Sequence, residues 1–137
     1  MIYNVSNRYT SGISLWRVDK TKFQITNFDK LTILITGSDY TLIRKEYSKV
    51  FETLLKEEIE ISEVIIFRKA TSETWDNYCE LKIKNHINPN NINLADYLHE
   101  SVWQYEHNLF VSSETKEELE KLAKGKLEFS ENFSHFG

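Results

Sequence analysis

The sequence is poor in cysteine, proline and glycine, and each shortage excludes a kind of structure. Among 137 residues there is one cysteine (Cys79), one proline and four glycines. A single cysteine cannot form an intrachain disulfide, which is typical of proteins in a reducing compartment. So few glycines and prolines leave no flexible linker, no low-complexity tail and no glycine-rich phosphate loop. We therefore expect a single compact domain over residues 1–137.

Long apolar stretches are also missing. No segment approaches the roughly 18 consecutive apolar residues that span a bilayer. The first residues, MIYNVSNRYTSG, lack the basic start and apolar core of a secretory signal. The sequence therefore predicts a cytoplasmic protein with no membrane partner.

Negative charge is present in excess and is unevenly distributed. The formal net charge is −4: residues 1–50 carry eight Lys/Arg against four Asp/Glu, a net of +4, and residues 51–137 carry nine against seventeen, a net of −8. An acidic majority argues against nucleic acid as a partner, because phosphates are neutralised by clustered Lys and Arg. It suits a basic protein partner, although acidic residues also serve simply to keep a surface soluble.

The first half of the chain has strand patterns followed by a helix pattern. Residues 13–18 and 22–28 alternate between apolar and polar positions across a short polar turn, which predicts a hairpin. Residues 31–36 form a nearly continuous apolar run, typical of a buried strand. Residues 41–58 place apolar side chains every three or four positions, which predicts an amphipathic helix.

The second half repeats this alternation of strands and helices. The predicted elements are strands at 60–70 and 77–87, a helix at 94–101, a hairpin of 102–106 and 109–112, a helix at 114–124 and a strand at 126–130. Ser112 or Ser113 caps the last helix, and Gly125 ends it. Strands dominate and follow one another, so the sequence predicts an α+β fold: a largely antiparallel mixed sheet with about three helices, mainly on one face.

The side chains that commonly carry chemistry are not arranged as a site. Cys79 lies on the apolar side of its predicted strand, so we expect it in the core. The four histidines lack the spacing of a zinc-binding pair, and the glutamate runs fit solvated helix faces. A tertiary site containing His99 and His107 is the remaining enzymatic alternative. We expect no enzyme and no cofactor.

Aromatic residues next to acidic ones are the positive signal. Aromatics make up 13% of the chain, and Tyr and Trp are enriched at binding hot spots. The predicted partner-binding residues are Glu73, Trp75, Asp76, Tyr78 and Glu80, together with Glu57, Glu58 and Glu60. The alternative is that the tryptophans fill the core, which we prefer for Trp103.

The C-terminal third, WQYEHNLFVSSETKEELEKLAKGKLEF, resembles the closing unit of small bacterial immunity-type proteins. The resemblance implies a cytosolic α+β domain that binds and neutralises a cognate toxin, here through an acidic and aromatic surface and as a monomer or weak dimer. The alternative is a phage or bacterial assembly protein whose aromatics mediate self-association. Phe133 and Phe136, in the tail, are expected to pack on the sheet.

Overall fold

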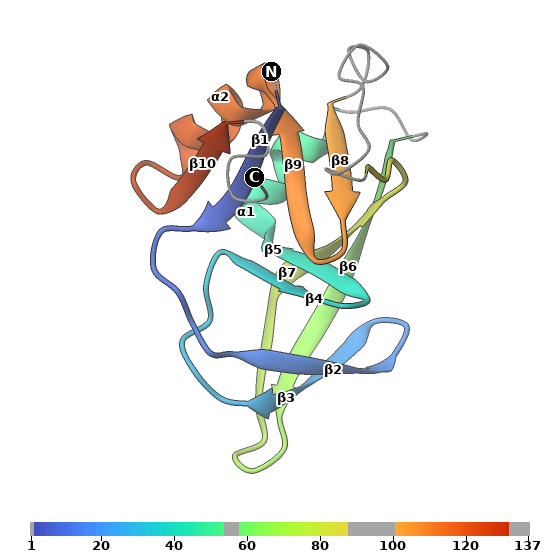
Figure 1. Ribbon diagram of the computed structural model, residues 1–137. Coiled ribbons are helices and arrows are strands. Elements are labelled where there is room, and N and C mark those ends of the chain that lie inside the picture. Colours follow the sequence, from blue (N-terminus) through green and yellow to red (C-terminus); the bar gives the residue numbers. More distant parts are fainter. Residues whose placement is uncertain (1, 54–57, 88–100, 132–137) are drawn as a thin grey trace.

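The strands form two sheets in the computed structural model, which describes residues 2–53, 58–87 and 101–131 (Figure 1). The smaller sheet has four strands in the order β10-β1-β9-β8, and the larger has six in the order β2-β3-β6-β7-β5-β4. The strands are β1 Ile2–Asn7, β2 Ser14–Asp19, β3 Lys22–Asn27, β4 Leu34–Gly37, β5 Tyr40–Arg44, β6 Ile59–Arg68, β7 Glu73–Ile83, β8 Val102–Tyr105, β9 Asn108–Ser112 and β10 Leu127–Glu131. The helices in the described residues are α1 Lys45–Glu52 and α2 Ser113–Leu122.

The six-stranded sheet is built around the long β6–β7 hairpin. Its pairings are antiparallel except for β3 with β6, which run parallel. The sheet curls around its own core, formed by buried side chains from β2 to β7: Leu15, Phe23, Ile25, Ile35, Tyr40, Leu42, Val64, Ile66 and Tyr78. Curling allows one sheet to bury an apolar face without a second layer, since its right-handed twist brings distant strands together.

The two edge strands of this sheet, β2 and β4, meet without a strand-to-strand ladder. The Tyr40 hydroxyl accepts a hydrogen bond from Leu15 N at 3.2 Å, and it lies 3.3 Å from Leu15 O, to which it donates. One phenol thus satisfies both backbone groups of an edge residue. Gly37 makes room for this ring, because a Cβ there would lie 2.3 Å from Tyr40 Cζ.

The main core lies between the four-stranded sheet, the two helices and strands β4 to β7 of the six-stranded sheet. Helix α1 packs on β5, β6 and β7, helix α2 packs on β1 and β9, and the helices contact each other. The Asn7 side chain joins the sheets: its Nδ2 donates to Leu34 O at 2.7 Å, and its Oδ1 accepts from Leu34 N at 3.1 Å.

Several predicted elements are confirmed. The hairpin β2–β3, the strand β6 and the hairpin β8–β9 lie where alternation placed them. The Ser112 side chain caps α2 by accepting from Thr115 N at 3.3 Å, and Gly125 adopts the positive φ of 70° expected after a helix. The fold is α+β and mostly strand.

The predicted helix at 41–58 is wrong in its first turn. Residues Tyr40–Arg44 form β5, which pairs with both β4 and β7, and α1 begins only at Lys45. Thr41, Leu42 and Ile43 are all buried, and their β-branched or apolar side chains suit a strand that is covered on both faces. The apolar spacing that predicted a helix therefore extended into residues that form a strand.

Other predictions need correction. A single sheet with three helices mainly on one face is wrong: there are two sheets, and each described helix packs on a different one. The predicted helix at 94–101 lies, apart from Ser101, outside the described residues, as do Phe133 and Phe136. Strand β7 covers Glu73–Ile83, so it begins and ends four residues before the predicted strand 77–87. Strand β1 was not predicted, although it pairs with both β9 and β10.

Replacing Tyr40 with phenylalanine tests the closure of the six-stranded sheet. The Tyr40→Phe variant keeps the ring but leaves Leu15 N and Leu15 O without this partner, so we expect a loss of about 1–2 kcal/mol in the free energy of unfolding. Urea denaturation measures the change. Tyr9→Phe is the matched control, because Tyr9 is 68% exposed; equal midpoints for the two variants would contradict the proposed closure.

Candidate functional site

The predicted partner-binding residues lie on or beside the β6–β7 hairpin. Its tip turns at residues 69–72, where Ser72 has a positive φ of 62°. Arg68 pairs with Glu73 across the last rung, and the Glu73 carboxylate accepts a hydrogen bond from Thr71 Oγ1 at 2.8 Å. Glu73 is exposed at this end of the molecule.

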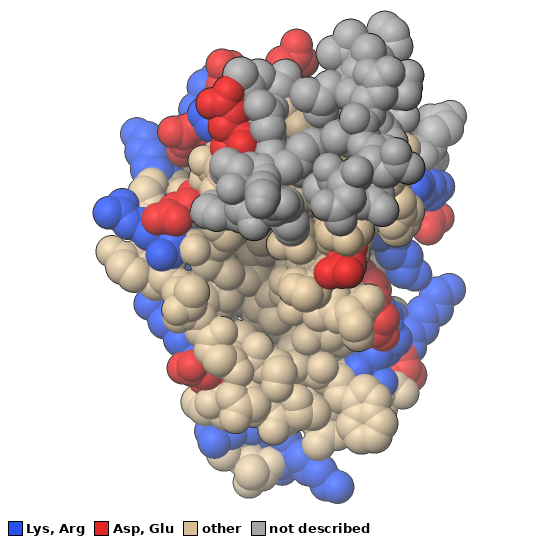
Figure 2. All heavy atoms as spheres, in the orientation of Figure 1, with Lys and Arg blue, Asp and Glu red and all other residues tan. Residues whose placement is uncertain are grey.

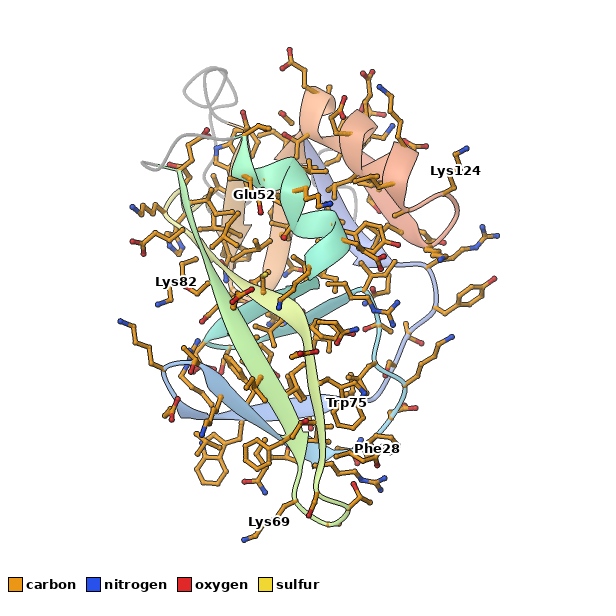
Figure 3. All side chains as sticks on the ribbon, turned by 180° about the vertical axis from the view of Figure 1, so that it is seen from behind. Phe28, Glu52, Lys69, Trp75, Lys82 and Lys124 are labelled. Atoms are coloured by element: carbon orange, nitrogen blue, oxygen red, sulfur yellow. The ribbon has the colours of Figure 1, made fainter. Side chains whose placement is uncertain are left out.

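Trp75 stands in β7 as part of an aromatic group near the tip. Its ring lies 6.4 Å from that of Phe28, centroid to centroid, and packs against the core of the curled sheet. The Arg68 guanidinium lies 3.8 Å from the Phe28 ring centroid, within cation–π range. Figure 3 shows Phe28 and Trp75 at the same end as Lys69 in the hairpin tip. Trp75 is half-buried, so it partly fills the core and partly reaches the surface.

Asp76 belongs to different surroundings from Trp75. The register of β7 slips beside Ile65, so that Val64 faces Tyr78 while Ile66 faces Trp75. This bulge leaves Asp76 exposed and close enough to Lys45 to help raise the pKa of that lysine, after the larger effect of its hydrogen bond to Glu63.

Tyr78 and Glu80 point into the curled sheet. The Tyr78 hydroxyl donates to Thr32 O at 2.5 Å and accepts from Arg44 Nε at 3.3 Å, and burial raises the pKa of the phenol. The Glu80 carboxylate accepts from Arg17 Nη1 at 3.1 Å and from Arg17 Nη2 at 2.5 Å. Both residues are at most 2% exposed. They are structural groups, and neither is available to a partner.

Arg17 holds the buried carboxylate and the seam of the sheet at once. Its Nη2 also donates to Asp39 O at 2.9 Å, and its Nε pairs with the Asp39 carboxylate at 3.2 Å. The guanidinium lies 4.7 Å from the centroid of the Phe23 ring. The hydrogen bonds to Glu80 are the largest cause of the raised pKa of Arg17, so the guanidinium stays charged.

The predicted binding glutamates at the start of β6 lie far from the hairpin tip. Glu58 is buried, and its Oε1 accepts from Ser101 N at 2.6 Å, which ties β6 to the start of β8. Glu60 is exposed and lines a cleft of about 640 Å³ with Glu52 and three lysines. Glu52 and Lys82 mark this side of the molecule in Figure 3. Glu57 lies outside the described residues.

The predicted surface is therefore not one surface. Glu60 and Arg68 are eight positions apart along β6, roughly 26 Å at about 3.3 Å per residue. The structure brings together only Glu73 and Trp75, beside Phe28 and Arg68.

A different set of exposed side chains was missed by sequence reasoning. Four of the six large apolar side chains exposed in the described residues lie on β2, on β6 or just after β3: Trp16 (68% exposed), Val18 (52%), Phe28 (47%) and Ile65 (40%). We call these four residues the outer strip. Figure 2 shows an area without charged side chains in the lower middle of the face drawn, with Lys and Arg side chains along its lower rim. The available signal was β2 itself, since Ile13, Leu15, Trp16 and Val18 give this edge strand apolar residues on both faces.

Strand register places two members of the outer strip, Trp16 and Ile65, in neighbouring rows of the sheet, with Gln24 and Lys22 of β3 between the two strands. Trp16 pairs with Gln24, which pairs with Phe67 on β6, so the three side chains form one row on the outer face. Lys22 pairs with Ile65 in the neighbouring row. Paired side chains on adjacent strands lie about 5 Å apart and contact each other.

No arrangement of reactive groups emerges in the part of the chain that the structure describes. No group of three or more His, Cys, Asp or Glu residues within it could hold a metal ion. Cys79 is buried, and burial raises the pKa of its thiol, which disfavours the reactive thiolate. Neither described helix is long and apolar enough to cross a membrane.

Comparisons with protein-family models, with curated proteins and with solved structures find no match to this chain.

The Glu80→Gln variant tests whether this predicted binding residue is structural. The amide keeps the shape but loses the charge, and it leaves Arg17 partly unpaired next to the core, so we expect a loss of about 2–4 kcal/mol in unfolding free energy. Glu63→Gln is the matched control, because it also breaks an ion pair but its side chain is 80% exposed. Chemical denaturation of both variants measures the difference, and similar midpoints would contradict a structural role.

Proposed function

We propose that the protein is a cytoplasmic binding protein of the inhibitor class, an immunity protein that neutralises a basic toxin domain. The single observation that carries this proposal is the outer strip. Large apolar side chains gathered on one face of a small domain commonly mark protein-binding surfaces. Trp16 is a strong candidate for the central contact, because Trp is enriched among the residues that dominate binding energy.

The partner's positive charge is inferred from the whole chain. A net charge of −4 attracts a basic protein at long range and speeds encounter. The outer strip itself is not acidic, because Lys20 and Lys22 lie beside it on the β2–β3 hairpin. The net negative charge of the whole chain therefore attracts the partner, and the apolar residues of the outer strip contact it.

Self-association through the same strip is the second candidate, and it would make the protein an assembly subunit. The observation that favours it is that Trp16 and Val18 lie on the edge strand β2. A second copy could cover that exposed face symmetrically.

Substitutions in the outer strip separate these functions. The tagged chain, expressed in its native host, should retain one basic protein at equal stoichiometry, and that protein should be toxic when it is expressed alone. Co-expression of the wild type should restore growth, whereas the Trp16→Ser, Ile65→Ser double variant should not. Both changes are on exposed positions, so the fold should persist, as circular dichroism can verify.

Leu122→Ser is the matched control, since Leu122 is 53% exposed but lies on α2. It should protect cells as well as the wild type does. Sedimentation of the purified chain decides the alternative: a stable dimer that the double variant converts to monomer would overturn the inhibitor proposal. Retention of toxin binding by the double variant would exclude the outer strip as the contact surface.

A further inference from the structure

A cleft of about 310 Å³ lies where three connections meet: β1 to β2, β3 to β4, and α2 to β10. Figure 1 shows these connections on the left side of the molecule. The polar and aromatic residues that line the cleft are Asn7, Tyr9, Lys30, Thr32, Arg44 and Lys126. We call this the loop cleft. Its volume is at the lower end of the range for small-molecule sites.

The loop cleft is lined by positive charge without a balancing carboxylate. Lys30, Arg44 and Lys126 line it, and no Asp or Glu does. None of these three forms an ion pair with a carboxylate of the described residues. The larger cleft beside Glu60 differs, because there two glutamates face three lysines. Three uncompensated cations around a concave surface favour an anion with more than one charge.

Arg44 is held in place before any ligand arrives. Its Nη2 donates to Leu31 O at 2.8 Å and its Nε donates to the Tyr78 hydroxyl at 3.3 Å. These bonds fix the plane of a half-buried guanidinium, so little side-chain entropy is left to lose on binding.

The neighbouring acid, Asp29, accepts hydrogen bonds from two backbone groups and forms no ion pair with a cation of the described residues. Asp29 Oδ2 accepts from Gly12 N at 2.7 Å and Oδ1 accepts from Lys30 N at 2.8 Å. These backbone hydrogen bonds lower the pKa of Asp29, the bond from Gly12 being the largest cause. The carboxylate is occupied by the loop itself, so the Lys30 ammonium remains available.

Tyr9 adds an aromatic surface to the same cleft. It is 68% exposed, and the Arg8 guanidinium lies 5.7 Å from its ring centroid. Arg8 is itself anchored to the α2–β10 connection, since its N donates to Lys126 O at 3.0 Å and its Nη1 donates to Gly125 O at 3.3 Å. An exposed ring beside a cluster of cations is the arrangement that binds a planar ring carrying phosphate.

We propose that the loop cleft binds a small phosphorylated molecule with a planar ring, of which a nucleoside monophosphate is the simplest. Lys30, Arg44 and Lys126 bind the phosphate, and Tyr9 stacks on the ring. Arginine binds phosphate oxygens through paired hydrogen bonds and lysine binds as a point charge. This site shares no residue with the outer strip, so it stands or falls independently of the proposed inhibitor function.

Three probes distinguish the contributions: adenosine monophosphate, inorganic phosphate and adenosine, each titrated into the full chain and followed by amide chemical shifts and calorimetry. Adenosine monophosphate should bind at least tenfold more tightly than phosphate, because stacking adds to the charge contribution. Adenosine should bind most weakly of the three. Shifts should concentrate at residues 7–9, 30–33 and 126. Equal affinities for phosphate and the nucleotide, or no saturable shift with either, would overturn the proposal.

Variants test the assigned residues. The Lys30→Glu, Lys126→Glu double variant should bind the nucleotide at least tenfold more weakly, and Tyr9→Ala should weaken the nucleotide but leave phosphate binding unchanged. The control is Lys20→Glu, Lys22→Glu, which makes the same change in net charge on the β2–β3 hairpin and should alter affinity less than twofold. An equal loss in the control would reduce the effect to net charge and contradict a defined site.

Discussion

The structure depends on how the six-stranded sheet closes at its open seam. Strands β2 and β4 are not joined by a ladder of backbone hydrogen bonds, and side chains take that role. Tyr40 satisfies Leu15 N and Leu15 O, and Arg17 joins the Asp39 backbone to the buried Glu80 carboxylate. A carboxylate that is 2% exposed requires a charged partner, because its desolvation is costly. Closure therefore places the Arg17 side chain on the inner face of the curled sheet. Its neighbours in the chain, Trp16 and Val18, then lie on the outer face.

Sequence reasoning found elements whose signal is local and missed those set by distant partners. Alternation identified β2, β3 and β6, and a serine and a glycine marked the ends of α2. Glu80 alternates with lysines and reads as a surface residue, yet its partner Arg17 is 63 positions away and no pattern connects the two. The boundary between β5 and α1 was not predicted because Ile43 fits the apolar stripe of a helix as well as a covered strand.

The candidate site could be predicted only in its character. Acidic neighbours drew attention to Trp75, but the register of β7 slips at Asp76, whose exposed carboxylate helps raise the pKa of Lys45, while the indole packs beside Phe28. Trp16 has no such neighbours and is nevertheless more exposed, because β2 is an edge strand whose inner face is already filled by Leu15. A high aromatic content indicates that the protein has a contact surface. The register of each strand determines which aromatic side chains face solvent and can take part in it.

The uneven charge of the chain has a spatial counterpart in the loop cleft. The first fifty residues have a net charge of +4, and they supply Arg8, Lys30 and Arg44. These three lie close to Lys126, which comes from the acidic remainder of the chain. Arg44 also reaches Tyr78, whose hydroxyl bonds to Thr32 O on the same connection that carries Lys30. A ligand bound to Arg44 would therefore contact the interior of the curled sheet through one side chain, and would stabilise the folded chain by a free energy that grows with the logarithm of the ligand concentration relative to its Kd. Three cations that form no ion pair with a described carboxylate, Lys30, Arg44 and Lys126, are thus brought together where three connections converge.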